Sequence, residues 1–104
     1  MPSVTAPFAY ALKNGTVSNT ALSLGTAPFD FSAANIAAAD HMKVTANANS
    51  VSYTIDATVP TAAVGHVLAA STNVTITGQR NIATWQMIRV GSDATVTVTL
   101  LKYS

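Results

Sequence analysis

Residues 94–101, ATVTVTLL, alternate apolar and polar side chains with a period of two. Val96, Val98 and Leu100 fall on one side of an extended chain, and the threonines between them fall on the other. This pattern predicts a strand with one buried side and one side that carries hydroxyl groups. The last part of the chain is therefore expected to form half of a hydrophobic core.

Three earlier segments show the same alternation. They are MKVTANA at 42–48, VSYTID at 51–56 and TNVTITG at 72–78. In VSYTID we expect Ser52, Thr54 and Asp56 to face solvent, because the residues between them are apolar or aromatic. NANS, at 47–50, has the composition of a turn between the first two strands.

Other segments are less regular. IATWQMIRV, at 82–90, is predicted as a strand from its β-branched and aromatic residues, with both sides covered or with a bulge. SNTALSLG, at 18–25, is predicted as a strand, and FAYAL, at 8–12, as a weaker strand or an arm. The alanine-rich segment 29–40 is expected to hold a helix of one to two turns within 32–40, capped by Asp30 or Ser32.

These elements predict an all-β protein of one domain. We expect an antiparallel β-sandwich, jelly-roll-like, with about six to eight strands and at most one short helix. Residues 1–15 are expected to form an N-terminal arm or first strand, and residues 16–104 the sandwich.

The composition excludes several classes of function. Charged residues make up 9% of the chain, against about 25% in an average soluble protein, which suits a protein that packs against neighbours. The net charge is +1 and the basic residues are scattered, so no nucleic-acid partner is expected. The absence of cysteine excludes disulfides and cysteine zinc sites. Because no apolar stretch reaches about 18 residues and no signal-peptide pattern is present, we expect no membrane partner and synthesis in the cytoplasm.

The segment YTIDATVPTAAVGH, at 53–66, holds the chain's candidates for chemistry. Asp56 and His66 could act as a base and the group that orients it. We favour a structural turn formed by Asp56, Pro60, Gly65 and His66, because no nucleophile motif, second carboxylate or phosphate loop accompanies them. No catalytic, cofactor or metal site is therefore expected.

The N-terminal segment is the candidate for contact with a partner. Its prolines, Pro2 and Pro7, make it a poor central strand, and Phe8 and Tyr10 could anchor it in a partner's surface. Alternatively, Phe8 and Tyr10 fold back onto the sandwich as an edge strand.

Residues 51–68 and 73–103 resemble a class of small bacteriophage virion proteins. The resemblance covers about the last half of the chain. It rests on Tyr53, Thr54, Asp56, Pro60, Thr61, Gly65, His66, Ile88, Arg89, Asp93 and Ala94. Ala57 stands where the pattern has glycine, from which we expect a turn of different shape.

The resemblance implies a capsid decoration (cement) protein, located on the virion surface and made in the host cytoplasm. Such a protein binds the outer capsid surface and stabilises the lattice of the major capsid protein, its expected partner. We further expect a homo-oligomer, with a trimer as the first choice, that has no cofactor and is not an enzyme. The alternative is a small head- or tail-fibre module that binds a host receptor or glycan.

Overall fold

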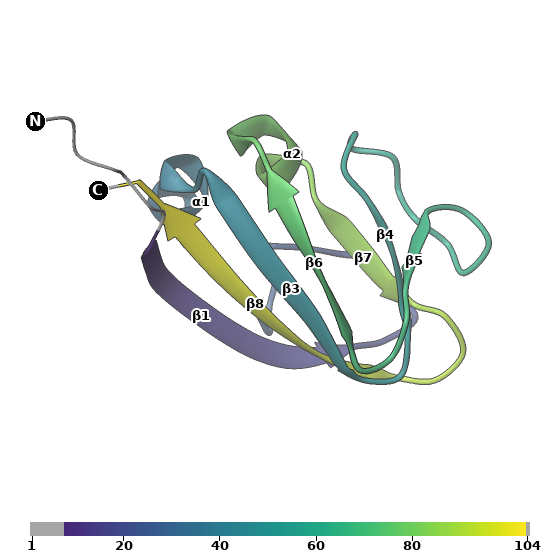
Figure 1. Ribbon diagram of the computed structural model, residues 1–104. Coiled ribbons are helices and arrows are strands. Elements are labelled where there is room, and N and C mark those ends of the chain that lie inside the picture. Colours follow the sequence, from purple (N-terminus) through teal and green to yellow (C-terminus); the bar gives the residue numbers. More distant parts are fainter. Residues whose placement is uncertain (1–7, 104) are drawn as a thin grey trace, which may run out of the picture.

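The computed structural model describes residues 8–103. They form two antiparallel sheets with the hydrophobic core between them (Figure 1). Sheet A contains, in spatial order, β1 (Phe8–Val17), β8 (Ala94–Lys102), β3 (His41–Ala48) and β6 (Thr72–Thr77). Sheet B contains, in spatial order, β2 (Leu22–Ser23), β7 (Gln86–Arg89), β4 (Val51–Thr54) and β5 (His66–Leu68).

The chain crosses from one sheet to the other at every connection between consecutive strands except that from β4 to β5. Its first and last strands meet in sheet A, where β1 pairs with β8. This order of strands is that of a jelly roll, in which Greek keys wrap around a common core. The predicted all-β antiparallel sandwich is therefore confirmed, with the strands β1 to β8 in the described residues.

Alternation along β8 and β3, the two central strands of sheet A, separates the core from the surface. Val96, Val98 and Leu100 of β8 have no exposed surface, and the same holds for Met42 and Val44 of β3. Burying an aliphatic side chain of this size stabilises the fold by about 1.5–3 kcal/mol. The inward positions predicted for these two strands are confirmed.

One short helix, α1 (Ala33–Ala38), lies where the alanine-rich segment predicted it. The Ser32 hydroxyl caps it by accepting a hydrogen bond of 3.1 Å from the Asn35 backbone N–H. Phe29 and Phe31, which precede the cap, are buried in the core. These two aromatic side chains attach the helix to the sandwich.

A second short helix, α2 (Gln79–Ala83), replaces the first part of the strand that we expected over 82–90. Gly78 adopts a φ of 101°, which ends β6 and turns the chain before the helix. Ile82 and Trp85 are fully buried, and their spacing of three residues places both on one side of a helical turn. The strand prediction is wrong there, and so is the expectation of at most one short helix.

The N-terminal strands differ from expectation in length. FAYAL, predicted as a weak strand or an arm, lies in β1, which has 10 residues. A bulge between Ala9 and Ala11 interrupts the pairing of β1 with β8. By contrast, only Leu22 and Ser23 of the segment 18–25 form a strand. The described part of the N-terminal segment therefore belongs to the sandwich.

Strand β4 is covered on both sides, contrary to the pattern that we expected. Val51 faces the core and is fully buried. Ser52 and Thr54, expected to face solvent, are only 1% and 6% exposed. The segment that connects β4 to β5, residues 55–65, covers their side of the strand, and we call it the β4–β5 loop.

Candidate functional site

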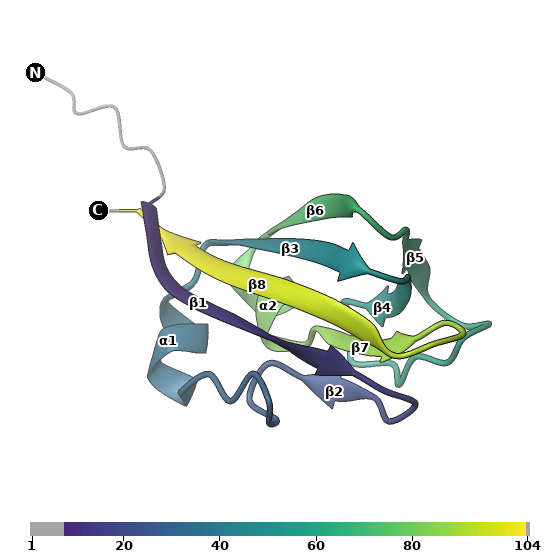
Figure 2. The ribbon, with the colours of Figure 1, turned by 90° about the horizontal axis from the view of Figure 1, so that it is seen from below.

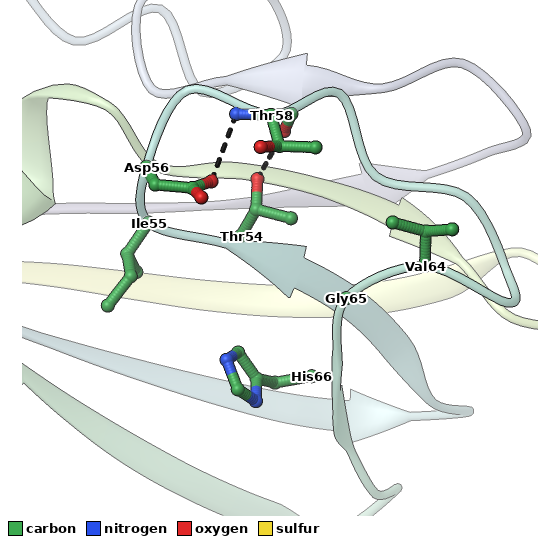
Figure 3. A pocket seen from close by; sticks show the side chains of 7 residues that line it. All are labelled: Thr54, Ile55, Asp56, Thr58, Val64, Gly65 and His66. Atoms are coloured by element: carbon green, nitrogen blue, oxygen red, sulfur yellow. Dashed lines mark hydrogen bonds between the residues drawn. The ribbon is translucent and has the colours of Figure 1, made fainter.

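The β4–β5 loop folds back over the outer side of β4 and is bound to it by side-chain hydrogen bonds (Figure 3). The Ser52 hydroxyl donates to the Val64 carbonyl at 3.0 Å, and the Thr54 hydroxyl donates to the Thr58 carbonyl. Both donors belong to buried residues, where a polar group needs a partner in place of water. The two bonds fix the loop near its start and near its end.

Gly65 allows the loop to return this closely to β4. Its φ is 132°, a conformation that residues with a side chain rarely adopt. A Cβ atom at this position would lie 2.4 Å from the Ser52 Oγ and 2.8 Å from the Tyr53 carbonyl oxygen. The glycine that precedes His66 therefore marks a close approach between two segments of the chain.

Asp56 closes the turn that leaves β4. Its carboxylate accepts a hydrogen bond of 3.1 Å from the Thr58 backbone N–H, as in an Asx turn. Hydrogen bonds from the side chain and the backbone of Thr58 lower the pKa of Asp56, and the nearby His66 lowers this pKa further. The structure thus places Asp56 in the turn that the sequence indicated.

Ala57 has a φ of 71°, in the left-handed region that glycine occupies most readily. We expected alanine to impose a different turn here, and this expectation is wrong. The hydrogen bond between Asp56 and Thr58 holds the turn, and the Gln86 Nε2 donates to the Ala57 carbonyl at 3.3 Å. The left-handed conformation of alanine costs about 1–2 kcal/mol, which these contacts offset.

A shallow hollow of about 280 Å³ lies between the β4–β5 loop and β5 (Figure 3). It is lined by Thr54, Ile55, Asp56, Thr58, Val64, Gly65 and His66. His66 is exposed, and its ring centre lies 5.5 Å from that of Tyr53. Within residues 8–103 its imidazole has no hydrogen bond to Asp56 or Thr54. The hollow offers carboxylate, hydroxyl and imidazole groups to a small polar ligand, but these groups are not joined in a proton relay.

The remaining predicted turn residue, Pro60, is buried, whereas nearby valines point into solvent. Val59 is 63% exposed, Val64 49% and Val67 of β5 61%. The backbones of Thr61 and Val64 exchange hydrogen bonds of 3.0 and 3.2 Å, which close the tip of the loop. The inner side of the loop is therefore buried against the sandwich, whereas part of its outer side is apolar and exposed to solvent.

The outer side of sheet A is a broad surface of hydroxyl and amide side chains, which we call the threonine face. The pairing of β8 and β3 with their neighbours aligns these side chains in rows across the sheet. One row contains Asn14, Thr97, Thr45 and Asn73, and the next contains Leu12, Thr99, Lys43 and Thr75. Among the outward positions of the described strands, Lys43 is the one lysine, arginine or acidic residue.

An apolar corner, formed by Phe8, Leu12 and Tyr103, lies at the end of sheet A where β1 begins and β8 ends. The pairing of β1 with β8 places Leu12, opposite Thr99, on the side of the threonine face, and Phe8, opposite Lys102, on the other side of the sheet. These three side chains are 42%, 59% and 46% exposed. The Tyr103 hydroxyl lies 2.8 Å from the His41 Nε2, and the two rings pack edge to face. The Lys102 ammonium group lies 6.0 Å from the centre of the Phe8 ring. The corner thus combines aromatic surface with one positive charge.

Two of the four residues predicted to contact a partner, Phe8 and Tyr10, lie in β1. The Tyr10 hydroxyl donates to the Asn35 carbonyl of α1, so this side chain is engaged within the chain. Phe8 keeps an exposed ring. The other two residues, Pro2 and Pro7, lie outside the described residues.

Sequence reasoning missed the buried hydroxyls of Ser52 and Thr54 and the exposed pair of His41 and Tyr103. A strand pattern does not tell which loop will cover its polar side, so no signal marked the two hydroxyls. The tyrosine could have been found, because the alternation that turns Thr99 outward continues to position 103.

Among residues 8–103, no group of three or more histidine or acidic side chains is arranged to hold a metal ion. In the same part of the chain, no helix has both the length and the apolar character needed to cross a membrane. No protein-family model matches the chain, and the search of curated proteins gives no match. Its function must therefore be argued from the fold and its surfaces.

Proposed function

We propose that the chain is a bacteriophage structural protein that decorates the outer capsid surface and stabilises the lattice of the major capsid protein. The observation that carries this proposal is the threonine face, a wide sheet surface with a single lysine. Few charges would have to be desolvated when another protein covers such a surface. The face therefore suits a protein that remains attached to an assembly.

The fold and the resemblance support the same function. Jelly rolls occur in viral capsid proteins and also in lectins, so the fold alone is compatible with either role. The resemblance of residues 51–103 to small virion proteins favours the first.

The apolar corner supplies anchoring contacts in this proposal. Tyr103 is exposed on the side of the threonine face, and Phe8 is exposed at the same end of sheet A. Aromatic side chains of this kind can each contribute about 2 kcal/mol or more when a partner buries them fully. Because Pro7 directly precedes Phe8, the contact predicted for the N-terminal segment adjoins this corner.

Many copies bind each capsid in this proposal, and their contacts add because the lattice repeats. A trimer at local three-fold positions is the arrangement that we expect. The role needs binding energy alone, without a cofactor, a nucleic acid or a catalytic group.

Binding to virions tests the proposal. Mass spectrometry of purified virions of the phage that encodes the chain should detect the protein, and purified protein should rebind to particles from which it has been stripped. Thr97→Glu, in the middle of the threonine face, should weaken rebinding at least about tenfold, because it buries an unpaired charge. Ala62→Glu, in the exposed β4–β5 loop, is the matched control and should leave rebinding unchanged. Absence from virions, or equal rebinding of the two variants, would contradict the proposal.

The hollow beside the β4–β5 loop favours a second candidate, a head- or tail-fibre module that binds a host receptor or glycan. Its carboxylate and hydroxyl groups are of the kind that hydrogen-bond the hydroxyls of a sugar. A glycan array distinguishes the two functions, because a decoration protein should bind no glycan. Glycan binding that Asp56→Ala abolishes, without loss of the fold, would favour the fibre module.

A further inference from the structure

The two edges of sheet A differ in how they are protected from pairing with another strand. An edge strand presents unpaired backbone groups to which a further strand can add. β1, at one edge, has a bulge between Ala9 and Ala11 and a charged residue, Lys13. Pro28 also lies against it, so close that a Cβ on Gly15 would be 2.4 Å from the proline Cγ. Bulges, charges and covering segments are the features that protect edges in natural sheets.

β6, at the opposite edge, has none of these features. Figure 2 shows it at the margin of sheet A, with no other described segment beyond it. Its sequence, TNVTIT, contains no charge and no proline, and its pairing with β3 runs without a bulge. Most of its residues are β-branched, which favours an extended chain. β6 is therefore well suited to pair with another strand.

We propose that the β6 edges of two copies of this chain pair antiparallel across a two-fold axis, which joins their A sheets into one continuous sheet. The sequence of β6 is self-complementary when this axis passes through Thr75. Thr75 then lies opposite its own counterpart. Val74 lies opposite Ile76 of the second copy, and Asn73 lies opposite Thr77. Because opposed residues share one side of a sheet, apolar side chains meet apolar ones and polar side chains meet polar ones.

The burial of β6 in one copy agrees with this register. Val74 packs against the core but is only half-buried. Ile76 of the second copy would extend its cover. On the outer side Asn73, Thr75 and Thr77 are exposed and can form cross-strand hydrogen bonds. A shift of one residue would place inward positions opposite outward ones, and a shift of two would place Ile76 opposite Thr72 or Val74 opposite Gly78. The register centred on Thr75 is the one that opposes Val74 and Ile76 and so keeps apolar residues together.

Charge does not oppose the contact. The charged residue of the threonine face, Lys43, lies directly beside Thr75 on β3. In the pair, the two lysines would be three strand spacings apart, about 14 Å. This separation exceeds the Debye length of about 8 Å at physiological ionic strength, so their repulsion is largely screened. The contact requires only a second copy. It is a two-fold contact through β6, separate from the three-fold arrangement on the capsid, and does not rest on the proposed function.

Analytical ultracentrifugation tests the pairing. Between about 10 μM and about 1 mM the protein should show an association that depends on concentration. Thr75→Lys and Thr75→Glu each place like charges directly opposite one another and should each weaken the association at least about tenfold. An equimolar mixture of the two variants should recover it, because lysine then faces glutamate across the axis. Circular dichroism of each variant checks that the fold is kept.

Two matched controls add the same charge elsewhere on sheet A. Thr95→Lys, at an exposed position of the central strand β8, should leave the association unchanged, as should Leu12→Lys on β1. Protein that stays monomeric at about 1 mM would overturn the proposal, and so would an oligomer that Thr75→Lys leaves intact. Dissociation by Leu12→Lys would assign the contact to β1 instead. Failure of the mixture to recover the association would rule out the register centred on Thr75.

Discussion

Sheet A and sheet B are stabilised in different ways. The strands of sheet A have 6 to 10 residues, whereas those of sheet B have 2 to 4. In sheet A, regular alternation buries a continuous layer of aliphatic side chains. In sheet B, buried hydroxyls on the outer side of β4 and a glycine in the adjoining loop hold short strands in place. We therefore expect sheet B to be more sensitive to single polar or backbone substitutions.

Gly65→Ala should have the largest effect. The new Cβ would clash with the Ser52 Oγ and the Tyr53 carbonyl, and its φ of 132° is unfavourable for alanine. Because both effects add, the free energy of unfolding should fall by at least about 3 kcal/mol, measured by urea denaturation. Gly91→Ala is the matched control and should be nearly neutral, since a Cβ there meets no atom within 4 Å. A loss below about 1 kcal/mol for Gly65→Ala would show that the loop can move away easily.

Thr54→Val and Thr95→Val together compare a buried hydroxyl of sheet B with an exposed hydroxyl of sheet A. Thr54→Val removes the donor to the Thr58 carbonyl while nearly keeping the side-chain volume. It should lower the free energy of unfolding by about 1–3 kcal/mol. Thr95→Val, on the threonine face, should change it by less than about 0.5 kcal/mol. Equal effects in urea denaturation would remove the proposed difference between the sheets.

The difference between the long, alternating strands of sheet A and the short strands of sheet B also determines how much of the fold could be predicted. Segments 42–48, 72–77 and 94–101 could be assigned because period two is a local property of the sequence. The segment 82–90 could not, since the spacing of Ile82 and Trp85 suits a helical turn as well as an irregular strand. Two features decide between the helical turn and the strand. They are the backbone of Gly78, which ends the preceding strand, and the packing of Ile82 and Trp85 in the core.

The candidate site was predictable to the extent that its residues have local preferences. Asp56, Pro60 and Gly65 all favour turns, and the structure places them in one connection. The burial of Ser52 could not be read from the sequence, because it depends on the side to which the loop folds. The positive φ of Ala57 likewise depends on hydrogen bonds from neighbouring segments.

Ala57→Gly should stabilise the protein. Glycine adopts the φ of 71° without the steric cost that alanine has there, although it adds entropy to the unfolded chain. The net gain should be about 0.5–1 kcal/mol, seen as a higher midpoint of thermal unfolding. Ala63→Gly, in the same loop at a residue without positive φ, should instead be neutral or slightly destabilising. A loss of stability in Ala57→Gly would contradict the left-handed turn.

Protonation of Asp56 should have the smallest effect and should act on the β4–β5 loop. Hydrogen bonds from Thr58 lower the pKa of Asp56 in the folded protein, whereas an aspartate in an unfolded chain titrates near about 3.9. Because the pKa is lower in the folded protein, the ionised carboxylate stabilises the folded loop. This contribution is complete above the pKa of the unfolded chain. This contribution is then lost as the pH falls through the lower, folded pKa. Because Asp56 is exposed, global unfolding should respond little.

Nuclear magnetic resonance can follow this titration at the two hydrogen-bonded groups. The Asp56 carboxyl carbon should titrate below its ordinary range, and the Thr58 amide proton should shift with the same midpoint, because it donates to that carboxylate. In Asp56→Asn the side-chain oxygen can still accept the hydrogen bond but does not titrate, so the acid-dependent shift of Thr58 should disappear. A midpoint at or above the ordinary range would mean that the turn is not held by this carboxylate, and that the loop depends on its buried hydroxyl contacts instead.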